Sequence, residues 1–482
     1  MTTITRLVQA RGRRGMRSLL AGAALLLAAS GTAAASATPA SAAPASAAPA
    51  SATPAATGPA AAAAAAALGP PPAVKVKPCV GKKVTGPFVV SGTQVYTNGG
   101  KGHPGATVFR SYGPTIAFTL DATVWHPSTD VAKDMDEQEI GWAADDWCAN
   151  TVRLQVNQDL LIERDFAVDQ SYLTAIEDEV ADAVSHGLVV VLNDSTESSA
   201  YASKELEPDL YTEFFWQVMA GLYGHGSSNP QHIDGPEHVI FDLFNEPRDS
   251  DTSWTTWYYG PPSPFPGPPP NVGYLYEGME TLARNVRAEA PRTLFWIEGP
   301  SFSSSFAGMY PNYMIRVRNV VYAIHHPAAQ GGKDDTAAWD AAYGYLVEKN
   351  IAPVVEGEWT NFGGAGVGNS ACWPDAIPAV SNYLKASSTG RGDGYLAAHG
   401  IGLSAYTLNS GRLLRQQYAL NKQGKLVTTA PNPLEPTVIT AATKTTVGWS
   451  CNPSAYSASA RTAGTEGAGQ AVYDFFKAEN QA

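Results

Sequence analysis

The sequence contains little that could hold the protein in a membrane. Its longest uninterrupted apolar stretch, residues 19–29, is shorter than the roughly 20 residues that a membrane-spanning helix requires. Five arginines precede this stretch, and small residues such as Ala35 and Ala37 follow it. A basic segment, a short apolar segment and an A-x-A-like cleavage site are typical of a secretory signal peptide. We therefore expect residues 1–37 to be a signal peptide and the mature protein to be secreted into the extracellular space, without membrane attachment.

Basic residues are also scarce. The chain has 32 Lys and Arg against 44 Asp and Glu. Removal of residues 1–37 with their five arginines would leave 27 basic against 44 acidic residues, a net charge of −17. Such a surface repels polyanions, so nucleic acids and anionic membranes are disfavoured as partners. The charge balance suits a neutral ligand.

Cysteine occurs only four times, at Cys79, Cys148, Cys372 and Cys451. No C-x-x-C spacing is present, which argues against a cysteine-only zinc site. An even number of cysteines in an exported chain favours disulfides, and four cysteines allow three pairings. We expect Cys79–Cys148 and Cys372–Cys451, because each bond would tie a surface loop to a neighbouring segment.

Two segments follow the expected signal peptide. Residues 38–72 consist almost entirely of Ala, Pro, Ser and Thr, a composition that cannot bury a core and predicts a disordered linker. Residues 73–482 have mixed composition and are long enough for one decorated α/β barrel. We expect this segment to be a single domain.

Eight apolar runs alternate with amphipathic stretches along this domain. Runs such as LVVVL and VIFDLF are apolar at nearly every position, which is typical of parallel strands buried on both faces. The expected strands are 115–120, 151–156, 188–193, 238–244, 293–298, 320–325, 352–358 and 402–408. The expected helices are 134–147, 169–187, 210–223, 272–290, 336–349, 374–385 and 470–477.

This alternation of expected strands and helices predicts an α/β fold, a closed (β/α)8 TIM barrel. A doubly wound open sheet is the alternative, but no G-x-G-x-x-G follows the first strand. Insertions are expected after strands four and eight, at residues 249–271 and 412–459, with a hairpin around residues 421–425 in the second. Both would lie on the C-terminal face, where barrel active sites are found.

Two glutamates end apolar strands on opposite sides of the expected barrel. In FDLFNEP, Asn245 and Glu246 follow strand four, and in PVVEGEW, Glu358 ends strand seven. Residues at these strand ends can face each other across the barrel mouth. Two facing carboxyl groups are what glycoside hydrolysis requires, and the alternative is that either Glu is a solvated loop residue.

Five segments resemble glycoside hydrolase family five, a family of retaining barrel enzymes. They are TVRLQV, the NEP triplet, YAIHHP, PVVEGEW and LNSG, and they occur in the family's order. The resemblance implies a cellulase-like glycosidase that degrades polysaccharides by double displacement. It assigns Glu246 as the acid/base, which must be protonated when substrate binds, and Glu358 as the nucleophile. It places Asn245 at the sugar 2-hydroxyl, Arg153 beside the nucleophile, which it would keep ionised, and His325 along the cleft.

The chain also departs from the family pattern around one sugar subsite. Residues 193–195 are Asn-Asp-Ser where many members have a His, Pro327 replaces a Tyr, and Tyr406 occupies the position of a Trp that floors the subsite. These changes leave the identity of the sugar undetermined, so endo-β-glucanase, β-mannanase and exo-acting β-glycosidase all remain candidates.

The first insertion is rich in aromatic residues, namely Trp254, Trp257, Tyr258 and Tyr259. Trp254 and Trp257 are candidates for stacking on sugar rings, and the alternative is that such residues anchor the loop. A proline-rich run after them favours a rigid wall over a flexible lid.

Two other classes of function were considered. A non-catalytic carbohydrate-binding barrel would not need both Glu246 and Glu358. A metalloenzyme built on His325 and His326 is disfavoured, because adjacent strand residues point to opposite faces. We therefore expect a monomer that acts on β-linked glycans and requires neither a metal ion nor a cofactor.

Overall fold

A computed structural model describes most of the chain from residue 79 onward. The described residues are 79, 84–116, 138–163, 165–195, 207–226, 236–247, 253–260, 276–326, 336–359, 376–386, 392–408, 413–414, 418–420, 426–428 and 469–481. All of them belong to one compact unit, Lys77–Ala482. The predicted signal peptide and linker, residues 1–37 and 38–72, lie outside the described residues. Among the helices described, none is long and apolar enough to cross a membrane.

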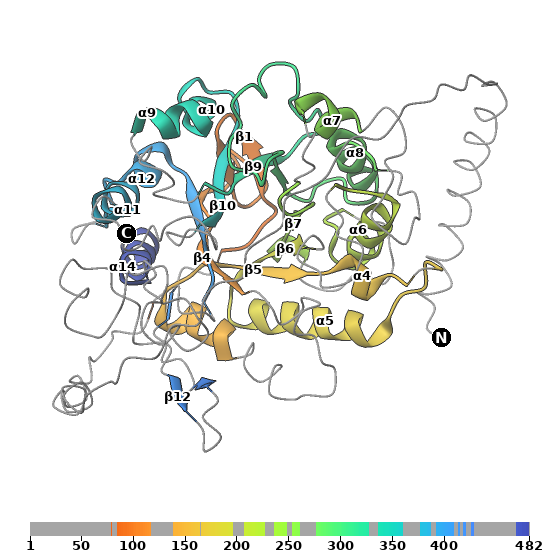
Figure 1. Ribbon diagram of the computed structural model, residues 1–482, viewed down its shortest axis with the longest axis horizontal. Helices are drawn as coiled ribbons and strands as arrows, with labels where there is room; N and C mark the ends of the chain where they lie inside the picture. Colours follow the sequence, from red (N-terminus) through yellow and green to blue (C-terminus); the bar gives the residue numbers. More distant parts are fainter. Residues whose placement is uncertain are drawn as a thin grey trace, which may run out of the picture. The chain divides into compact units, whose positions relative to one another are not determined.

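Eight parallel strands close into a barrel, with helices around it (Figure 1). Each strand pairs with the next along the chain, and the last pairs with the first. The predicted (β/α)8 barrel is therefore confirmed. The strands are β4 (Tyr112–Ile116), β5 (Thr151–Val156), β6 (Val189–Asp194), β7 (Val239–Asp242), β8 (Phe295–Glu298), β9 (Val320–Ile324), β10 (Val354–Trp359) and β11 (Gly402–Tyr406).

The first barrel strand begins earlier than predicted. We expected residues 115–120, but β4 starts at Tyr112, and residues 117–120 lie outside the described part. The pair Gly113–Pro114 is typical of a turn, yet here it lies inside the strand. Gly113 is required because a Cβ at this position would lie 1.6 Å from the carbonyl oxygen of Thr151 on β5.

Most predicted helices are present. α5 (Gln170–Ser185) is capped by Asp169, which accepts hydrogen bonds from the backbone N–H groups of Ser171 and Tyr172. α6 (Leu210–Tyr223) begins with a capping box formed by Asp209 and Thr212. The other helical segments are η1 (Trp142–Asp146), α4 (Gln158–Leu161), η3 (Pro236–His238), α8 (Met279–Glu289), α9 (Thr336–Trp339), η4 (Asp340–Gly344), α10 (Tyr345–Glu348), α11 (Ala376–Leu384), α12 (Tyr395–His399) and α14 (Gly469–Gln481).

A small antiparallel sheet covers the N-terminal end of the barrel. Its strands β1 (Val89–Ser91), β2 (Gln94–Tyr96) and β3 (Val108–Phe109) were not predicted. Phe88, Val95 and Phe109 pack in one apolar cluster with interior residues of the barrel strands, which are Val189, Val191, Ile240, Trp296, Val321, Ala323 and Val355. This layer closes the barrel bottom.

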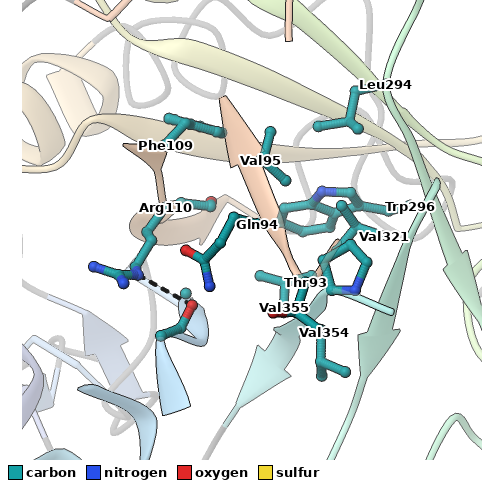
Figure 2. A pocket seen from close by; sticks show the side chains of 14 residues that line it. Thr93, Gln94, Val95, Phe109, Arg110, Leu294, Trp296, Val321, Val354 and Val355 are labelled. Carbon is teal, nitrogen blue, oxygen red and sulfur yellow. Dashed lines mark hydrogen bonds between the residues drawn. The ribbon is translucent and has the colours of Figure 1, made fainter. Parts of the chain in front are cut away.

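A small cavity remains between this sheet and the barrel strands. Figure 2 shows Gln94, Val95 and Arg110 on one side of it and Trp296 and Val321 on the other. Arg110 Nε donates to the carbonyl oxygen of Gly400 at 3.1 Å. The cavity volume of about 30 Å³ has room for roughly two water molecules at most. Its position at the N-terminal end of the strands is that of a stabilising layer rather than of a barrel active site.

Both predicted insertions contain regular structure. The first forms α7 (Trp254–Tyr259), capped by Ser253. The second forms the predicted hairpin, with β12 (Tyr418–Leu420) antiparallel to β13 (Leu426–Thr428). The Cys79–Cys148 disulfide is also confirmed, whereas Cys372 and Cys451 lie outside the described residues.

Candidate active site

A polar layer lies directly above the apolar barrel core. Side chains two residues apart on a strand share a face, so the core residues Ile240, Trp296 and Ala323 place Asp242, Glu298 and His325 on the barrel interior. These three are all 3% exposed or less. The alternation of side chains along each strand therefore places these polar groups inside the C-terminal mouth of the barrel.

Arg153 is the central cation of this layer. Its guanidinium is fully buried and donates to four side chains: Asp242 Oδ2 at 2.9 Å, Asn245 Oδ1 at 2.6 Å, Glu298 Oε1 at 3.0 Å and Glu358 Oε2 at 2.9 Å. Burial alone would lower the pKa of Arg153, but the three carboxylates outweigh it and raise the pKa. Arg153 therefore stays charged, and it brings the predicted residues Asn245 and Glu358 together.

His325 lies between two carboxyl groups. Its Nδ1 is 3.1 Å from Glu246 Oε1, and its Nε2 is 3.1 Å from Glu298 Oε1. Burial would lower the pKa of His325, but Glu298 and the bond to Glu246 raise it well above its ordinary value. The raised pKa favours the imidazolium form of the ring.

Glu298 is buried completely and has three nitrogen partners. Besides Arg153 and His325, it accepts the backbone N–H of Glu246 at 2.6 Å through Oε2. Burial raises the pKa of Glu298 to about 7, while His325 and Arg153 act in the opposite direction. Arg153 and the Glu246 amide can only donate, so this arrangement favours the carboxylate form.

Glu358 reaches the interior through an irregularity in β10. Between Glu356 and Trp359, β10 advances three residues while β11 advances two, from Leu403 to Ala405. Such a bulge re-aims side chains: Glu356 faces Tyr383 of α11, whereas Glu358 faces Arg153. Gln155 Nε2 also donates to Glu358 at 3.3 Å.

The charge of Glu358 is set by opposing effects. Burial and the Glu246 carboxylate raise its pKa, whereas His325 and Arg153 lower it, and the net direction is upward. From Arg153 alone we expected stabilisation of the ionised form. That effect is present but does not outweigh burial.

Glu246 and Glu358 face each other at short range. One oxygen of each carboxyl group and a ring nitrogen of His325 all lie within 4.8 Å of one another. Retaining glycosidases have carboxyl groups about 5–5.5 Å apart, and inverting ones about 6.5–9.5 Å. An approach of single oxygen atoms to within 4.8 Å is compatible with the shorter of these two separations.

These atoms also have the spacing of metal ligands. Both ring nitrogens of His325 lie 3.1 Å from carboxylate oxygens. His326 Nδ1 lies 3.1 Å from the carbonyl oxygen of Ser304 and does not join His325. At the helical surface, Asp340, Glu348 and His399 form a second group with such spacing.

Gly357 makes close approach of β9 and β10 possible. A Cβ at this position would lie 2.9 Å from Ala323 Cβ and 3.2 Å from His325 Nε2. We expect Gly357→Ala to displace His325 and the bulge, and to lower kcat/KM about 10- to 100-fold, the cost of a misplacement of roughly 1 Å. Steady-state kinetics with an aryl β-glycoside would test this. Unchanged kinetics in a folded variant would contradict it.

Behind β10, Glu356 forms a separate buried network. It accepts hydrogen bonds from Tyr383 Oη and from the His326 backbone N–H, and Tyr383 Oη in turn contacts Tyr343 Oη at 2.7 Å. Burial raises the pKa of Glu356 to about 8. The folded protein therefore retains a proton at neutral pH that the unfolded chain releases near pH 4.5.

This difference predicts a pH-dependent stability. Because the folded-state pKa is the higher one, the contribution of Glu356 is complete below about pH 4.5 and is lost as pH rises to about 8. The titration of Glu356 makes the unfolding free energy of wild type decline over that range, with a slope of up to about 1.4 kcal/mol per pH unit for one proton. Glu356→Gln removes the titrating group and should make the slope smaller by that amount. Urea unfolding at several pH values would measure it, and parallel curves for both proteins would contradict it.

The aromatic predictions require one correction. Trp257 was expected to stack on sugar, but its side chain is 1% exposed and its Nε1 donates to the Glu298 carbonyl at 3.0 Å. It is an anchor that fixes α7 beside β8. Trp254 is half-buried, donates to the Ala307 carbonyl at 2.8 Å and packs edge-on against Trp257. Tyr406 is half-buried at the end of β11, and sugar stacking by Trp254 and Tyr406 stays a prediction.

The structure also gives the positions of Asn193 and Asp194. Asn193 is fully buried beside Gln155 and Asp242 in the strand register. Asp194 Oδ1 accepts the Gln158 backbone N–H at 3.3 Å, so it supports α4. Pro327 lies outside the described residues.

Three polar residues of this site were not predicted: Asp242, Glu298 and Gln155. Asp242 and Glu298 are polar residues in otherwise apolar strands, VIFDLF and FWIE, and Gln155 lies two residues after Arg153 in TVRLQV. That signal also marked Glu246 and Glu358, and it could have identified Glu298.

Comparisons with known proteins identify a matching family and several similar structures. The family model described as "Cellulase (glycosyl hydrolase family 5)" matches residues 113–390. Similar solved structures include a hyperthermophilic endocellulase from the archaeon Pyrococcus horikoshii, at 14% identity over 68% of this chain and 91% of that chain, with a TM-score of 0.47. The β-glucanase SdGluc5_26A from Saccharophagus degradans is similar at 16% identity over 68% and 85% of the two chains, with a TM-score of 0.45. No curated protein sequence matches the chain.

Proposed function

The chain belongs to the cellulase family, glycosyl hydrolase family 5, and we propose that it is a secreted enzyme that hydrolyses β-glucans with retention of configuration. Glu246 acts as acid/base and Glu358 as nucleophile. The observation that carries the proposal is the approach of the two carboxyl groups, with oxygen atoms within 4.8 Å, which is compatible with the separation of about 5–5.5 Å used in double displacement.

In the first step, Glu358 attacks the anomeric carbon while Glu246 donates its proton to the leaving oxygen. The glycosidic C–O bond breaks, and a covalent ester forms on Glu358. In the second step, Glu246 takes a proton from water, the water attacks the anomeric carbon, and Glu358 leaves as a carboxylate. Asn245, held at Oδ1 by Arg153, is the residue that we assign to binding of the sugar 2-hydroxyl.

The proposed substrate and the proposed secretion are supported by different observations. The matched family is described as cellulase, so a soluble β-1,4-glucan is the first substrate to test, followed by β-mannan. Residues 1–37 support secretion. A monomer that needs no membrane or metal ion is part of the same proposal.

Product analysis tests the mechanism directly. During hydrolysis of an aryl β-cellobioside, proton NMR should show β-cellobiose first and the α-anomer only after mutarotation. Appearance of α-cellobiose first would contradict retention, and absence of turnover on all β-linked substrates would contradict the function. A fast fall in polymer viscosity would indicate endo action, whereas release of monosaccharide alone would indicate exo action.

A further inference from the structure

Glu298 connects the two cations of the active site. Its Oε1 lies 3.0 Å from Arg153 Nη2 and 3.1 Å from His325 Nε2. Each cation in turn lies closest to one of the two reacting carboxyl groups: Arg153 Nη1 bonds to Glu358 at 2.9 Å, and His325 Nδ1 lies 3.1 Å from Glu246 and 4.0 Å from Glu358. The fully buried Glu298 is therefore the fixed anion in the middle of a chain of charges.

The proposed reaction moves one negative charge along this chain. Before glycosylation Glu358 is the anion, and after it Glu358 is a neutral ester and Glu246 is the anion. The charge thus passes from the Arg153 end to the His325 end, while the total charge of the cluster stays constant. A cation must already be in place at each end, because reorganisation of buried charges during the reaction is costly.

Glu298 also holds the backbone of Glu246. Glu246 has a φ of +46°, in the left-handed region that non-glycine residues rarely adopt. Such a conformation is strained and persists where the surroundings enforce it. The 2.6 Å bond from the Glu246 N–H to Glu298 Oε2 is one such constraint.

We propose that Glu298 is a positioning residue for the acid/base: it holds the His325 ring beside Glu246 and fixes the backbone from which Glu246 projects. This inference rests on the proposed function for its kinetic consequences, but not for the state of His325. Glu298 itself touches no reacting atom. It acts through His325 and through the Glu246 amide.

The test compares Glu298→Gln with a matched control, Asp242→Asn. Both changes remove one buried carboxylate that bonds to Arg153, but Asp242 Oδ2 bonds to Arg153 Nε at 2.9 Å, and Oδ1 has no hydrogen-bond partner among the described residues. Only Glu298 contacts His325 and the Glu246 amide. The two variants therefore separate a loss of charge from a loss of positioning.

The first readout is the protonation state of His325, measured by NMR of histidine-labelled protein at pH 7 and assigned with His325→Asn. Wild type and Asp242→Asn should show an imidazolium, and Glu298→Gln a neutral ring. A neutral ring in wild type would overturn the proposal without any variant. An imidazolium that persists in folded Glu298→Gln would overturn it as well.

The second readout is the dependence of rate on the leaving group. Glu298→Gln should lower kcat/KM for phenyl β-cellobioside about 10- to 100-fold, within the range of general acid catalysis, and affect the dinitrophenyl substrate much less. His325→Gln should reproduce this pattern if Glu298→Gln does not fold, and Asp242→Asn should not. Equal losses on both substrates would overturn the proposal. If wild type were inactive on both substrates, the proposed function would be contradicted. The NMR experiment would still test the state of His325 independently.

Discussion

Replacing Glu358 with glycine is expected to lower kcat on aryl β-cellobiosides by about 10⁵-fold, because the covalent step loses its nucleophile. Glu358 is a side chain at the barrel mouth, 15% exposed, and not part of the apolar core, so the variant should fold. The loss of its carboxylate leaves Arg153 with two buried carboxylate partners, Asp242 and Glu298. Circular dichroism would establish the fold, and steady-state kinetics the loss.

Azide should restore part of this activity. A small anion can occupy the space of the missing carboxylate beside Arg153 and attack the anomeric carbon from the same face. With a dinitrophenyl substrate the product should be the α-glycosyl azide, the inverted configuration. Glu237→Gln, an exposed position just before β7, is the matched control and should show wild-type rates without response to azide. A β-glycosyl azide from Glu358→Gly would contradict the nucleophile assignment.

The barrel and the pair of glutamates could be predicted because both depend on local patterns. The strands are buried on both faces and therefore appear as apolar runs, with clear helical periodicity between them, as in α5 and α6. Glu246 and Glu358 interrupt such runs at strand ends. Barrel closure then brings them together although 112 positions separate them along the chain.

The bulge in β10 could not be predicted from the sequence. In VVEGEW, strict alternation would place Glu356 and Glu358 on the same face. The structure separates them, because three residues of β10 oppose two of β11. Their environments differ accordingly: Glu356 belongs to a tyrosine network behind the strand, and Glu358 to the Arg153 cluster. Only the register of the neighbouring strand determines which Glu enters the barrel.

The burial of individual aromatic residues could not be predicted from the sequence either. The sequence shows that Trp254 and Trp257 lie in one insertion but not which of them faces inward. α7 turns Trp257 toward β8, where its indole N–H binds the Glu298 carbonyl. The three-residue strands β1 and β2 were missed for a related reason, since segments this short carry too few residues to show a period.

Replacing Glu246 with alanine is expected to affect the two steps of the reaction differently. With phenyl β-cellobioside, whose leaving group needs a proton, kcat/KM should fall about 10³- to 10⁴-fold, near the upper range for general acid catalysis. With 2,4-dinitrophenyl β-cellobioside, which departs as a stable anion, the first step should remain fast. The second step lacks its base, so the glycosyl-enzyme should accumulate and both kcat and KM should fall. Pre-steady-state measurements should show a burst of dinitrophenolate.

Azide distinguishes this variant from Glu358→Gly. It needs no general base, so it should accelerate breakdown of the accumulated glycosyl-enzyme on Glu358 and give the β-glycosyl azide. The two variants therefore yield opposite anomers from one substrate, because azide replaces the nucleophile in one and the water in the other. His325→Asn is a suitable comparison, since it removes the imidazolium that lies 3.1 Å from Glu246 but keeps the acid. It should show a weaker form of the same leaving-group dependence. An α-glycosyl azide from Glu246→Ala, or an equal loss with both leaving groups, would exclude Glu246 as the acid/base.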